Sequence, residues 1–456
     1  MSEELYIYNS LTNKKELFKE IEPGKIGLYV CGPTVYSSSH MGHARSAIVF
    51  DSIVRFLKFL KYETKYVRNF TDIDDKIIAR AKEENKNHGD ISSFYKQEYI
   101  EDMNNLGCME PDLQPCVSEN MNEIIALISK IIDSGHAYVN GGDVYFDVKK
   151  FSEYGKLSNQ SIEAITSNTR LEINPNKNDD LDFALWKKAK EDEPSWDSPW
   201  GTGRPGWHIE CSAMSCKYLG ETFDIHGGGR DLIFPHHENE VAQSECISKK
   251  SFANYWIHNG LININKEKMS KSIGNIINIR EGLKSWDKNV IRVLFLTHHY
   301  RSPVDLSEEK LLEIKKLLLK ISKKIDSNPK SGIKSNFKEM WTNAMLDDFN
   351  TAKAFGYYFK YINDGLLSND DISSIEEFEN TMGISDWRDK ISQESENLNY
   401  SLSKDSESKI NQIILDRNLA RNAKDWDKAD ELRLKAEKLG VRLLDTKDGT
   451  SWERKD

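Results

Sequence analysis

Residues 206–240 concentrate side chains that bind metals. Pro235 suits the first turn of a helix, where its missing N–H would have no partner. His236 and Glu240 would then lie four residues apart on one face of that helix, which presents two ligands together. With the thiol of Cys211 they could supply three of the four ligands of a tetrahedral zinc site. The alternative is an ordinary polar helix beside a buried cysteine, and a fourth ligand must come from elsewhere in the chain.

Two further motifs have residue types suited to phosphate chemistry. His40 and His43 flank Gly42 in the run HMGH, where a helix starts after a strand. Free N–H groups and the helix dipole favour phosphate there, and Gly42 leaves room for an adenine ring. Lys268 and Lys271 belong to KMSKS, whose polar surroundings predict an exposed loop that could close over a phosphoryl group. Two histidines alone would more often be structural, but their position after the first strand favours a functional role, whereas KMSKS as a bare charge cluster would mean little.

The elements around these motifs alternate between strand and helix. The apolar run Ile26–Cys31 predicts a strand, the apolar spacing after His43 predicts a helix, and residues 64–70 predict a second strand. This order indicates a parallel α/β sheet, in which ligands bind beyond the carboxyl ends of the strands. Cys31, the HMGH run and Thr71 all lie at such ends.

Length and composition indicate a soluble multidomain protein. The chain has 456 residues, of which 38% are hydrophobic and 30% are charged, and it has neither a long apolar run nor a signal peptide. We therefore expect no membrane association. Six scattered cysteines fit a reducing compartment, so the cytoplasm is the expected location. The net charge of −10 argues against a protein that coats nucleic acid, but it permits reading of one RNA through local basic patches.

We expect a Rossmann-like catalytic domain that is interrupted and then followed by other domains. The catalytic domain would comprise residues 1–110 and 201–265, with an insertion at 111–200. The remaining parts would be a KMSKS and stem-contact region (266–305), a helical bundle (306–385), a linker (386–408) and a small mixed C-terminal domain that binds the anticodon (409–456).

Taken together, the motifs resemble those of a known enzyme family. HMGH after a strand and KMSKS over two hundred residues later resemble the signature pair of class I aminoacyl-tRNA synthetases. The runs LYVCGPTVY, YVRNFTDIDDKII, FDIHGGGRDLIFPHHENE and EKMSKSIGN are similar to those of cysteinyl-tRNA synthetases. The resemblance extends from about Leu5 to the C-terminal GTSWER and is clearest over the catalytic part.

The resemblance also implies roles for individual residues. It makes Cys31 the fourth ligand of one zinc ion per chain, which would bind the thiolate of the substrate. The residues expected to stabilise the reacting phosphorus of Mg²⁺-bound ATP are His40, His43, Lys268 and Lys271. Those expected to complete the ATP site are Gly42, Gly227, Gly228, Gly229 and Asp231. Those expected to line the amino-acid pocket are Thr71, Trp207 and His226.

The implied reaction is the joining of L-cysteine to tRNA-Cys through a cysteinyl-adenylate, by an enzyme expected to be monomeric. One alternative is a ligase that joins activated cysteine to a small amine. About 150 residues after Leu306 disfavour it, because they would serve to read tRNA. A second alternative is a non-catalytic zinc protein that binds RNA. It would have no reason to keep HMGH, HGGGRD and KMSKS together.

Overall fold

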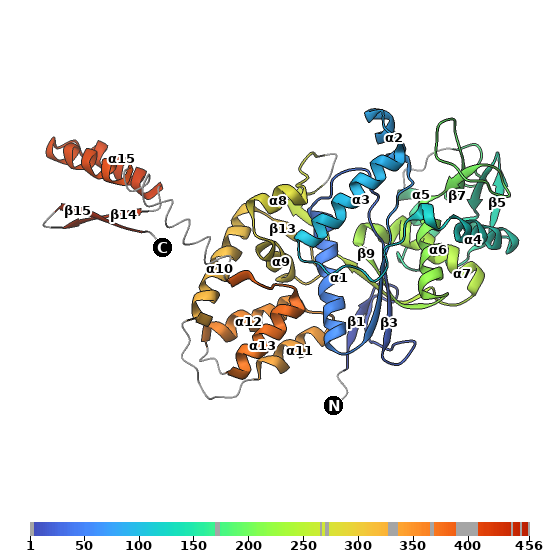
Figure 1. The fold of residues 1–456 in the computed structure, drawn as a ribbon, viewed down its shortest axis with the longest axis horizontal. Helices are drawn as coiled ribbons and strands as arrows, with labels where there is room; N and C mark the ends of the chain where they lie inside the picture. Colours follow the sequence, from blue (N-terminus) through green and yellow to red (C-terminus); the bar gives the residue numbers. More distant parts are fainter. Residues whose placement is uncertain are drawn as a thin grey trace. The chain divides into compact units, whose positions relative to one another are not determined.

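The chain divides into two compact units, which are described separately here (Figure 1). The first is Met1–Ser385 and the second is Asp386–Asp456. The computed structural model describes residues 4–168, 174–264, 267–269, 273–326, 336–364, 369–388, 409–438, 441–446 and 449–454. The finer domain boundaries expected from the sequence stay predictions.

A four-stranded parallel sheet forms the centre of the first unit, with strand order β10-β9-β3-β4. The strands are β3 (Lys25–Val30), β4 (Glu63–Arg68), β9 (Phe223–Gly229) and β10 (Ala253–Asn259). Helix α1 (Met41–Phe59) connects β3 to β4. Both faces of such a sheet are covered, and Leu28, Tyr29 and Val30 of β3 are fully buried. The predicted Rossmann-like sheet is therefore confirmed.

Further helices lie in the connections between the strands (Figure 1). They are α2 (Asp75–Glu84), α3 (His88–Asn105), α6 (Trp207–Leu219) and α7 (Glu238–Ser248). A short hairpin, β1 (Tyr6–Asn9) with β2 (Lys14–Leu17), precedes the sheet. Its Asn9 accepts a hydrogen bond from the backbone N–H of Trp256 at 3.0 Å, so the start of the chain is tied to the edge strand β10.

The helix predicted to begin at Pro235 has an irregular first turn. Regular helix α7 starts at Glu238, and Ile233–His237 form a distorted turn. Phe234 is extended there (φ −130°, ψ 131°) and is followed by a cis peptide bond to Pro235. Phe234 is the one residue of this turn with non-helical angles, as suits a residue before proline, so the helical backbone runs from Pro235 into α7. His236 and Glu240 therefore lie four residues apart on one helical face as predicted, with His236 Nε2 3.2 Å from Glu240 Oε1.

The insertion adds a second sheet that is antiparallel, with strand order β5-β6-β7-β8. Its strands are β5 (Ala137–Asn140), β6 (Asp143–Phe146), β7 (Phe183–Lys188) and β8 (Gly203–Pro205), and it is accompanied by helices α4 (Met121–Asp133) and α5 (Ile162–Asn168). Ile128 of α4 and Phe146 of β6 belong to the same apolar cluster as Tyr29 and Cys31. The insertion thus shares a core with the central sheet.

The predicted KMSKS loop starts in a strand. Lys268 belongs to β12 (Glu267–Lys268), which pairs with β11 (Ile262–Ile264), and β11 pairs with β13 (Val304–Leu306). The prediction of a loop was therefore wrong for Lys268, because this residue is held by backbone pairing. Lys271 lies outside the described residues.

Helices complete the first unit (Figure 1). They are α8 (Ile279–Ser285), α9 (Lys288–Leu296), α10 (Glu308–Asp326), α11 (Phe337–Leu346), α12 (Thr351–Asp364) and α13 (Asn369–Met382). Two buried ionic groups join them to α1 and to the β1 hairpin. Arg292 pairs with Asp51 of α1 and donates to the Met382 carbonyl at 2.8 Å. Asp348 accepts hydrogen bonds from the Tyr8 backbone N–H at 2.9 Å and from the Arg301 guanidinium at 2.8 Å.

The second unit contains a helix over residues 409–422, helix α15 (Trp426–Lys438) and the antiparallel hairpin of β14 (Val441–Thr446) and β15 (Gly449–Arg454). Ile410 and Ala436 are buried with Val441 in its small core. Arg417 pairs with Asp445 at 2.8 Å and fixes the helix to the hairpin.

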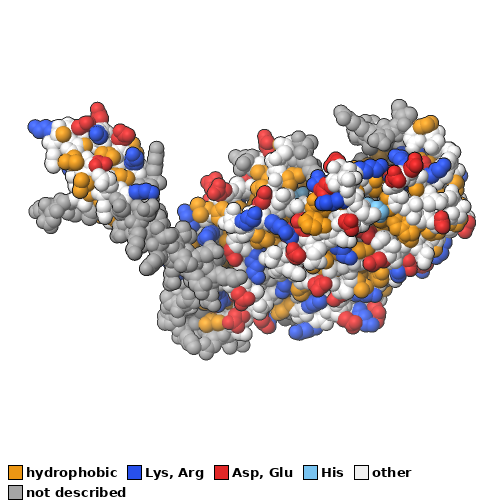
Figure 2. All heavy atoms as spheres, turned by 45° about the horizontal axis from the view of Figure 1, so that its top comes forward, with side chains coloured by type: hydrophobic (Ala, Val, Ile, Leu, Met, Phe, Trp, Pro, Cys, Tyr) orange, Lys and Arg blue, Asp and Glu red, His pale blue; other side chains and the backbone are white. Residues whose placement is uncertain are grey.

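Basic and acidic side chains are interspersed on the face drawn in Figure 2, with no large patch of one sign. Among the described residues, no helix is long and apolar enough to span a bilayer.

Candidate active site and metal centre

The carboxyl ends of the parallel strands open into one cavity. Cys31 follows β3, Arg68 ends β4, Gly229 ends β9 and Asn259 ends β10, and all four residues line it. Seven residues predicted from the sequence lie in its wall, namely Cys31, His40, Gly42, His43, Trp207, Gly229 and Asp231. Seven others lie outside this wall and are buried, namely Thr71, Cys211, His226, Gly227, Gly228, His236 and Glu240.

The four predicted metal ligands, one of which is Cys31, meet in one buried cluster. The Sγ atoms of Cys31 and Cys211 are 3.6 Å apart. Glu240 Oε1 lies 3.4 Å from Cys31 Sγ and 3.2 Å from His236 Nε2. The ligand atoms of all four residues lie within 4.8 Å of one another, and all four side chains are buried.

These separations match the edges of a zinc tetrahedron. Zn–S bonds of about 2.3 Å and Zn–N or Zn–O bonds of about 2.0 Å place two sulfurs about 3.8 Å apart, sulfur and oxygen about 3.5 Å apart, and nitrogen and oxygen about 3.3 Å apart. The observed 3.6, 3.4 and 3.2 Å are each slightly shorter. The two thiols, the imidazole and the carboxylate therefore fit Zn²⁺ in both chemistry and spacing.

A second set of four residues competes for the same place. It combines Cys31 and Glu240 with His226 and His237. His226 Nε2 lies 2.8 Å from Glu240 Oε2, which is a hydrogen bond, and His237 Nε2 lies 4.0 Å from Glu240 Oε1. One separation is too short and the other too long for the edge of about 3.3 Å. We therefore favour the set that contains Cys211 and His236.

Neighbouring side chains orient the favoured ligands. His208 Nδ1 lies 3.0 Å from His236 Nδ1, so the Nε2 atom of His236 is the one directed at the cluster. His226 holds the second carboxylate oxygen of Glu240 at 2.8 Å. Such outer contacts fix the orientation of a ligand and its tautomer. Sequence reasoning assigned no role to His208, although WHIEC places it three residues before Cys211.

Burial sets the protonation of the cluster when it holds no metal. It raises the pKa of the Cys31 thiol well above the ordinary value and lowers the pKa of His236 well below it. The hydrogen bond with Cys31 is the largest single effect on Cys211 and lowers its pKa, but burial together with the carboxylates of Glu240 and Glu210 raises this pKa above its ordinary value. The thiols therefore stay protonated at neutral pH without a cation. Metal binding must release their protons.

Sequence reasoning also missed a chain of buried histidines beside the cluster. His237 Nδ1 lies 2.8 Å from His258 Nε2, and His258 Nδ1 lies 2.8 Å from Ser10 Oγ. His237 follows a predicted ligand directly, so its position in PHHENE was a usable signal. His258 lies in β10 with no local motif, and only the pairing of β10 with β9 brings it to the site.

The HMGH motif starts helix α1 as predicted. His40 is the N-cap, and its Nδ1 accepts a hydrogen bond from the Gly42 N–H at 3.1 Å. His43 Nδ1 accepts from the His40 N–H at 3.2 Å, and the two rings stack at 3.9 Å. A Cβ on Gly42 would lie 2.9 Å from the His40 ring and 3.2 Å from Met269 Cε. The absence of a side chain at Gly42 therefore avoids a clash with His40 and close contact with Met269 in the cavity wall.

The three consecutive glycines differ in their surroundings: Gly227 and Gly228 are tightly packed, whereas Gly229 lines the cavity. A Cβ at Gly227 would lie 2.3 Å from the Phe50 ring, and one at Gly228 would lie 2.7 Å from His237 Cε1. Both glycines are required by packing behind the cavity. Only Gly229 lines the cavity, where its neighbour Asp231 also lies. The predicted contact of adenosine with all three glycines stays a prediction.

Two predicted pocket residues flank the cluster. Thr71 Oγ1 donates to Glu210 Oε2 at 3.0 Å, and burial raises the pKa of Glu210 well above its ordinary value. The Trp207 ring lies 4.3 Å from the His236 ring and is 38% exposed, so one of its faces is open to the cavity. The cavity therefore borders the candidate metal cluster at Cys31 and Trp207, and the first residues of helix α1 form another part of its wall.

Residues 17–316 match the family model described as the class I (C) tRNA synthetase catalytic domain. A cysteine–tRNA ligase of Thermodesulfovibrio yellowstonii is 46% identical over 484 residues, covering 98% of this chain and 99% of the relative. One of Legionella pneumophila is 46% identical over 455 residues, covering 99% of each.

Solved structures of other synthetases share the fold. A Mycobacterium tuberculosis methionyl-tRNA synthetase in complex with methionyl-adenylate has a TM-score of 0.55 at 12% identity, covering 78% of this chain and 88% of that one. A leucyl enzyme of Agrobacterium radiobacter in a ternary complex has a TM-score of 0.55 at 9% identity, covering 80% of this chain and 84% of that one.

Proposed function

Because the chain belongs to the cysteine–tRNA ligase family of class I tRNA synthetases, we propose that it activates L-cysteine with ATP and transfers the cysteinyl group to the 3′-terminal adenosine of tRNA-Cys. The observation that carries this proposal is the geometry of one cavity. It combines a buried cluster of two thiols, an imidazole and a carboxylate with the HMGH helix start.

Cys31, Cys211, His236 and Glu240 would hold Zn²⁺. When bound, zinc supplies a Lewis acid to which the thiolate of cysteine can bind. The shape of a pocket separates substrates that differ by one small group by only about 1–3 kcal/mol. A thiolate is a much better zinc ligand than the hydroxyl of serine. Selection at this cluster therefore removes the need for a separate hydrolytic correction site.

The surrounding side chains would orient the amino acid. Trp207 has one face open to the cavity beside His236. Thr71 is held by Glu210, and His226 is held by Glu240. These contacts restrict the side chains before substrate arrives, which lowers the entropic cost of binding.

In the first step, an oxygen of the cysteine carboxylate would form a bond to the α-phosphorus of ATP while the bond to the bridging oxygen breaks and pyrophosphate leaves. His40 and His43 at the start of α1 would bind the charge that grows on the phosphoryl oxygens. Lys268 and Lys271 would add positive charge, with Mg²⁺ bound to the triphosphate. Gly42, Gly229 and Asp231 would bound the adenosine site.

In the second step, the terminal ribose 2′-hydroxyl of tRNA would attack the cysteinyl carbonyl, and AMP would leave. A ligase for small amines is not favoured, because the relatives match the chain over 98–99% of its length, including the second unit. We expect the enzyme to act as a monomer in the cytoplasm.

The test is cysteine-dependent exchange between ATP and pyrophosphate, with serine as the control, before and after zinc is stripped by a chelator. We expect exchange with cysteine alone, lost on stripping and restored by zinc. Exchange that kept its preference for cysteine without metal would give the cluster a purely structural role. Absence of exchange in the zinc-loaded enzyme would refute the function.

A further inference from the structure

Arg68 is a buried cation in the wall of the cavity that the proposed chemistry does not use. Its side chain is 4% exposed at the end of β4 and lines the cavity. No carboxylate pairs with it within the described part of the chain, and its Nε atom has no hydrogen-bond partner there. A buried guanidinium without an anion is costly. The site therefore suits a ligand that brings negative charge.

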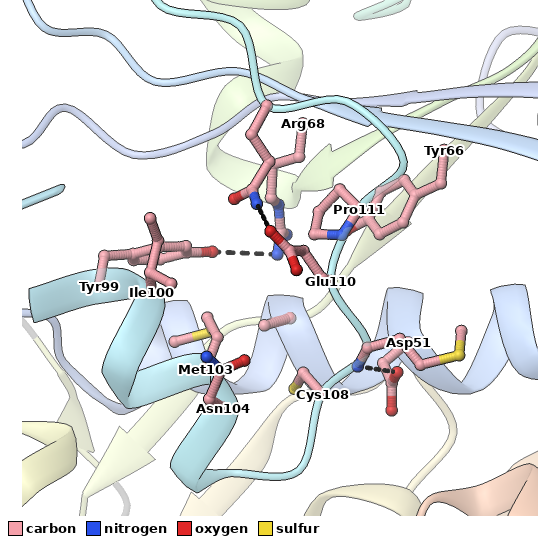
Figure 3. A pocket seen from close by; sticks show the side chains of 13 residues that line it. Asp51, Tyr66, Arg68, Tyr99, Ile100, Met103, Asn104, Cys108, Glu110 and Pro111 are labelled. Atoms are coloured by element: carbon pink, nitrogen blue, oxygen red, sulfur yellow. Dashed lines mark hydrogen bonds between the residues drawn. The ribbon is translucent and has the colours of Figure 1, made fainter. Parts of the chain in front are cut away.

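The hydrogen bonds of Arg68 point two hydroxyl groups at the cavity. Its Nη1 atom donates to the Tyr99 hydroxyl at 3.1 Å and its Nη2 atom donates to Ser46 Oγ at 3.3 Å. Figure 3 shows the guanidinium and the Tyr99 hydroxyl directed at each other, seen from a small neighbouring cavity. Arginine can only donate, so it occupies lone pairs of both oxygens. The hydroxyl hydrogens are left to be donated, and both Ser46 and Tyr99 line the main cavity.

A second cation lines the same cavity. Lys76 of α2 lines the cavity, is exposed, and lies with its Nζ 5.5 Å from the centre of the Tyr36 ring. Its ammonium forms no ion pair with any residue that the structure describes. Arg68 with its partners Ser46 and Tyr99, and Lys76 in the wall of the same cavity, therefore offer donors without an ion-paired carboxylate, which is the chemistry that binds a phosphate group. We call these four residues the β4 donor cluster.

The sheet order separates this cluster from the expected nucleotide wall. Strand β4 lies at one edge of the order β10-β9-β3-β4, and β9, which ends in Gly229, lies two strands away. Neighbouring strands are about 4.8 Å apart, so the two walls are separated by roughly 10 Å. Cys31, one of the proposed metal ligands, directly follows β3, which lies between these two strands. An adenylate that joins the nucleotide wall to the candidate metal cluster would leave the β4 side open for the attacking tRNA.

We propose that the β4 donor cluster binds the phosphodiester that precedes the terminal adenosine of tRNA and so positions the attacking hydroxyl. This inference rests on the proposed function. Other phosphate in the reaction comes from ATP, and the two sources make opposite predictions. A cluster for ATP would affect activation, whereas one for the tRNA terminus affects binding of that terminal nucleotide and the transfer step.

The test is a binding cycle with the zinc-loaded full-length enzyme. Affinity is measured for tRNA-Cys and for the same tRNA shortened by its terminal adenosine and the phosphate on its 5′ side. Tyr99→Phe keeps the ring, which packs edge-on against Phe70 at 5.5 Å, and removes one donor. Arg68→Lys and Lys76→Met alter the two cations. Tyr95→Phe, from the same helix but outside the cavity wall, is the matched control for the loss of a hydroxyl.

For Tyr99→Phe we expect a loss of about tenfold in affinity for intact tRNA, and a much smaller loss for the shortened tRNA. Charging should fall at least about five times more than cysteine-dependent exchange, while Tyr95→Phe should match the wild type in both. Equal losses on the two tRNAs, or exchange falling as far as charging, would refute the inference. So would wild-type enzyme that binds both tRNAs equally. Failure of the wild type to charge tRNA-Cys at all would instead refute the proposed function.

Discussion

Replacing one histidine at a time decides which four residues hold the metal. His236 belongs only to the favoured set and His237 only to the competing one. His226 belongs to the competing set, but in the favoured arrangement it orients Glu240 from outside. Asparagine removes the ring nitrogen in each variant and stays polar. The three variants therefore give a different order of metal affinity under each assignment.

The expected sizes follow from the positions of the side chains. Zinc binding of roughly 10–16 kcal/mol shared by four ligands assigns about 3 kcal/mol to each, which corresponds to about a hundredfold in affinity. His236→Asn should lose at least that much. His226→Asn removes an orienting hydrogen bond of 2.8 Å and should lose roughly tenfold. His237→Asn breaks a contact with His258 and should leave metal affinity nearly unchanged.

The assay is zinc content and competition with a graded chelator on purified full-length variants. Cys216→Ser is the matched control for Cys211→Ser, because both thiols lie on α6 and only Cys211 belongs to a candidate set. The cysteine-to-serine ratio of exchange is measured on the same samples. A His237 variant that lost zinc while the His236 variant kept it would refute the tetrahedral reasoning.

Three further tests concern ATP binding, packing and acid stability, through substitutions at Gly42, Gly227 and Asp348. A Cβ at Gly42 would approach the His40 ring at 2.9 Å, so Gly42→Ala should raise the KM for ATP in exchange about tenfold, or ~1.4 kcal/mol; an unchanged KM would contradict the assigned wall. Gly227→Ala would put its methyl group 2.3 Å from Phe50 and should lower unfolding free energy by about 1–3 kcal/mol in denaturant titration. Burial raises the pKa of Asp348, but hydrogen bonds and Arg301 lower it more, to below the ordinary 3.8. Its stabilisation is therefore complete above that pH and lost as the pH falls through the lowered value. Asp348→Asn should lower the unfolding free energy by about 2 kcal/mol at neutral pH and reduce the fall of the melting temperature at acid pH. If the variant lost as much melting temperature at acid pH as the wild type, other carboxylates would cause that loss.

Much of the central sheet was predictable because parallel strands buried on both faces are short apolar runs. The strand expected at Ile26–Cys31 is β3 (Lys25–Val30), and the strand expected at 64–70 is β4 (Glu63–Arg68). Their order in the sheet was not predictable, since it depends on long-range pairing. The irregular turn at Ile233–His237 was not predictable from spacing, because it depends on the extended conformation of Phe234.

The metal cluster shows where local patterns stop being informative. Three of its members lie within 206–240, so spacing alone indicated them. Cys31 is far away in the chain, and the bottom-up interpretation required only some fourth ligand. Strand β3 pairs with β9, and that pairing places Cys31 beside the other three. The resemblance to a family supplied this topology in advance, and spacing could not have done so.

The β4 donor cluster had no signal in the sequence at all. Arg68 occurs in YVRNF, where it looks like the polar end of a strand, and its partners come from two different helices. A charged residue is costly to bury unless it is paired, so its missing anion became visible only with the surrounding residues in place. The predicted metal ligands behave in the opposite way. Thiols and imidazoles can be buried while neutral, which lets a sequence keep a metal site folded before the ion arrives. Arg68 has no such neutral form, and this is why we assign its charge to a substrate that must come and go.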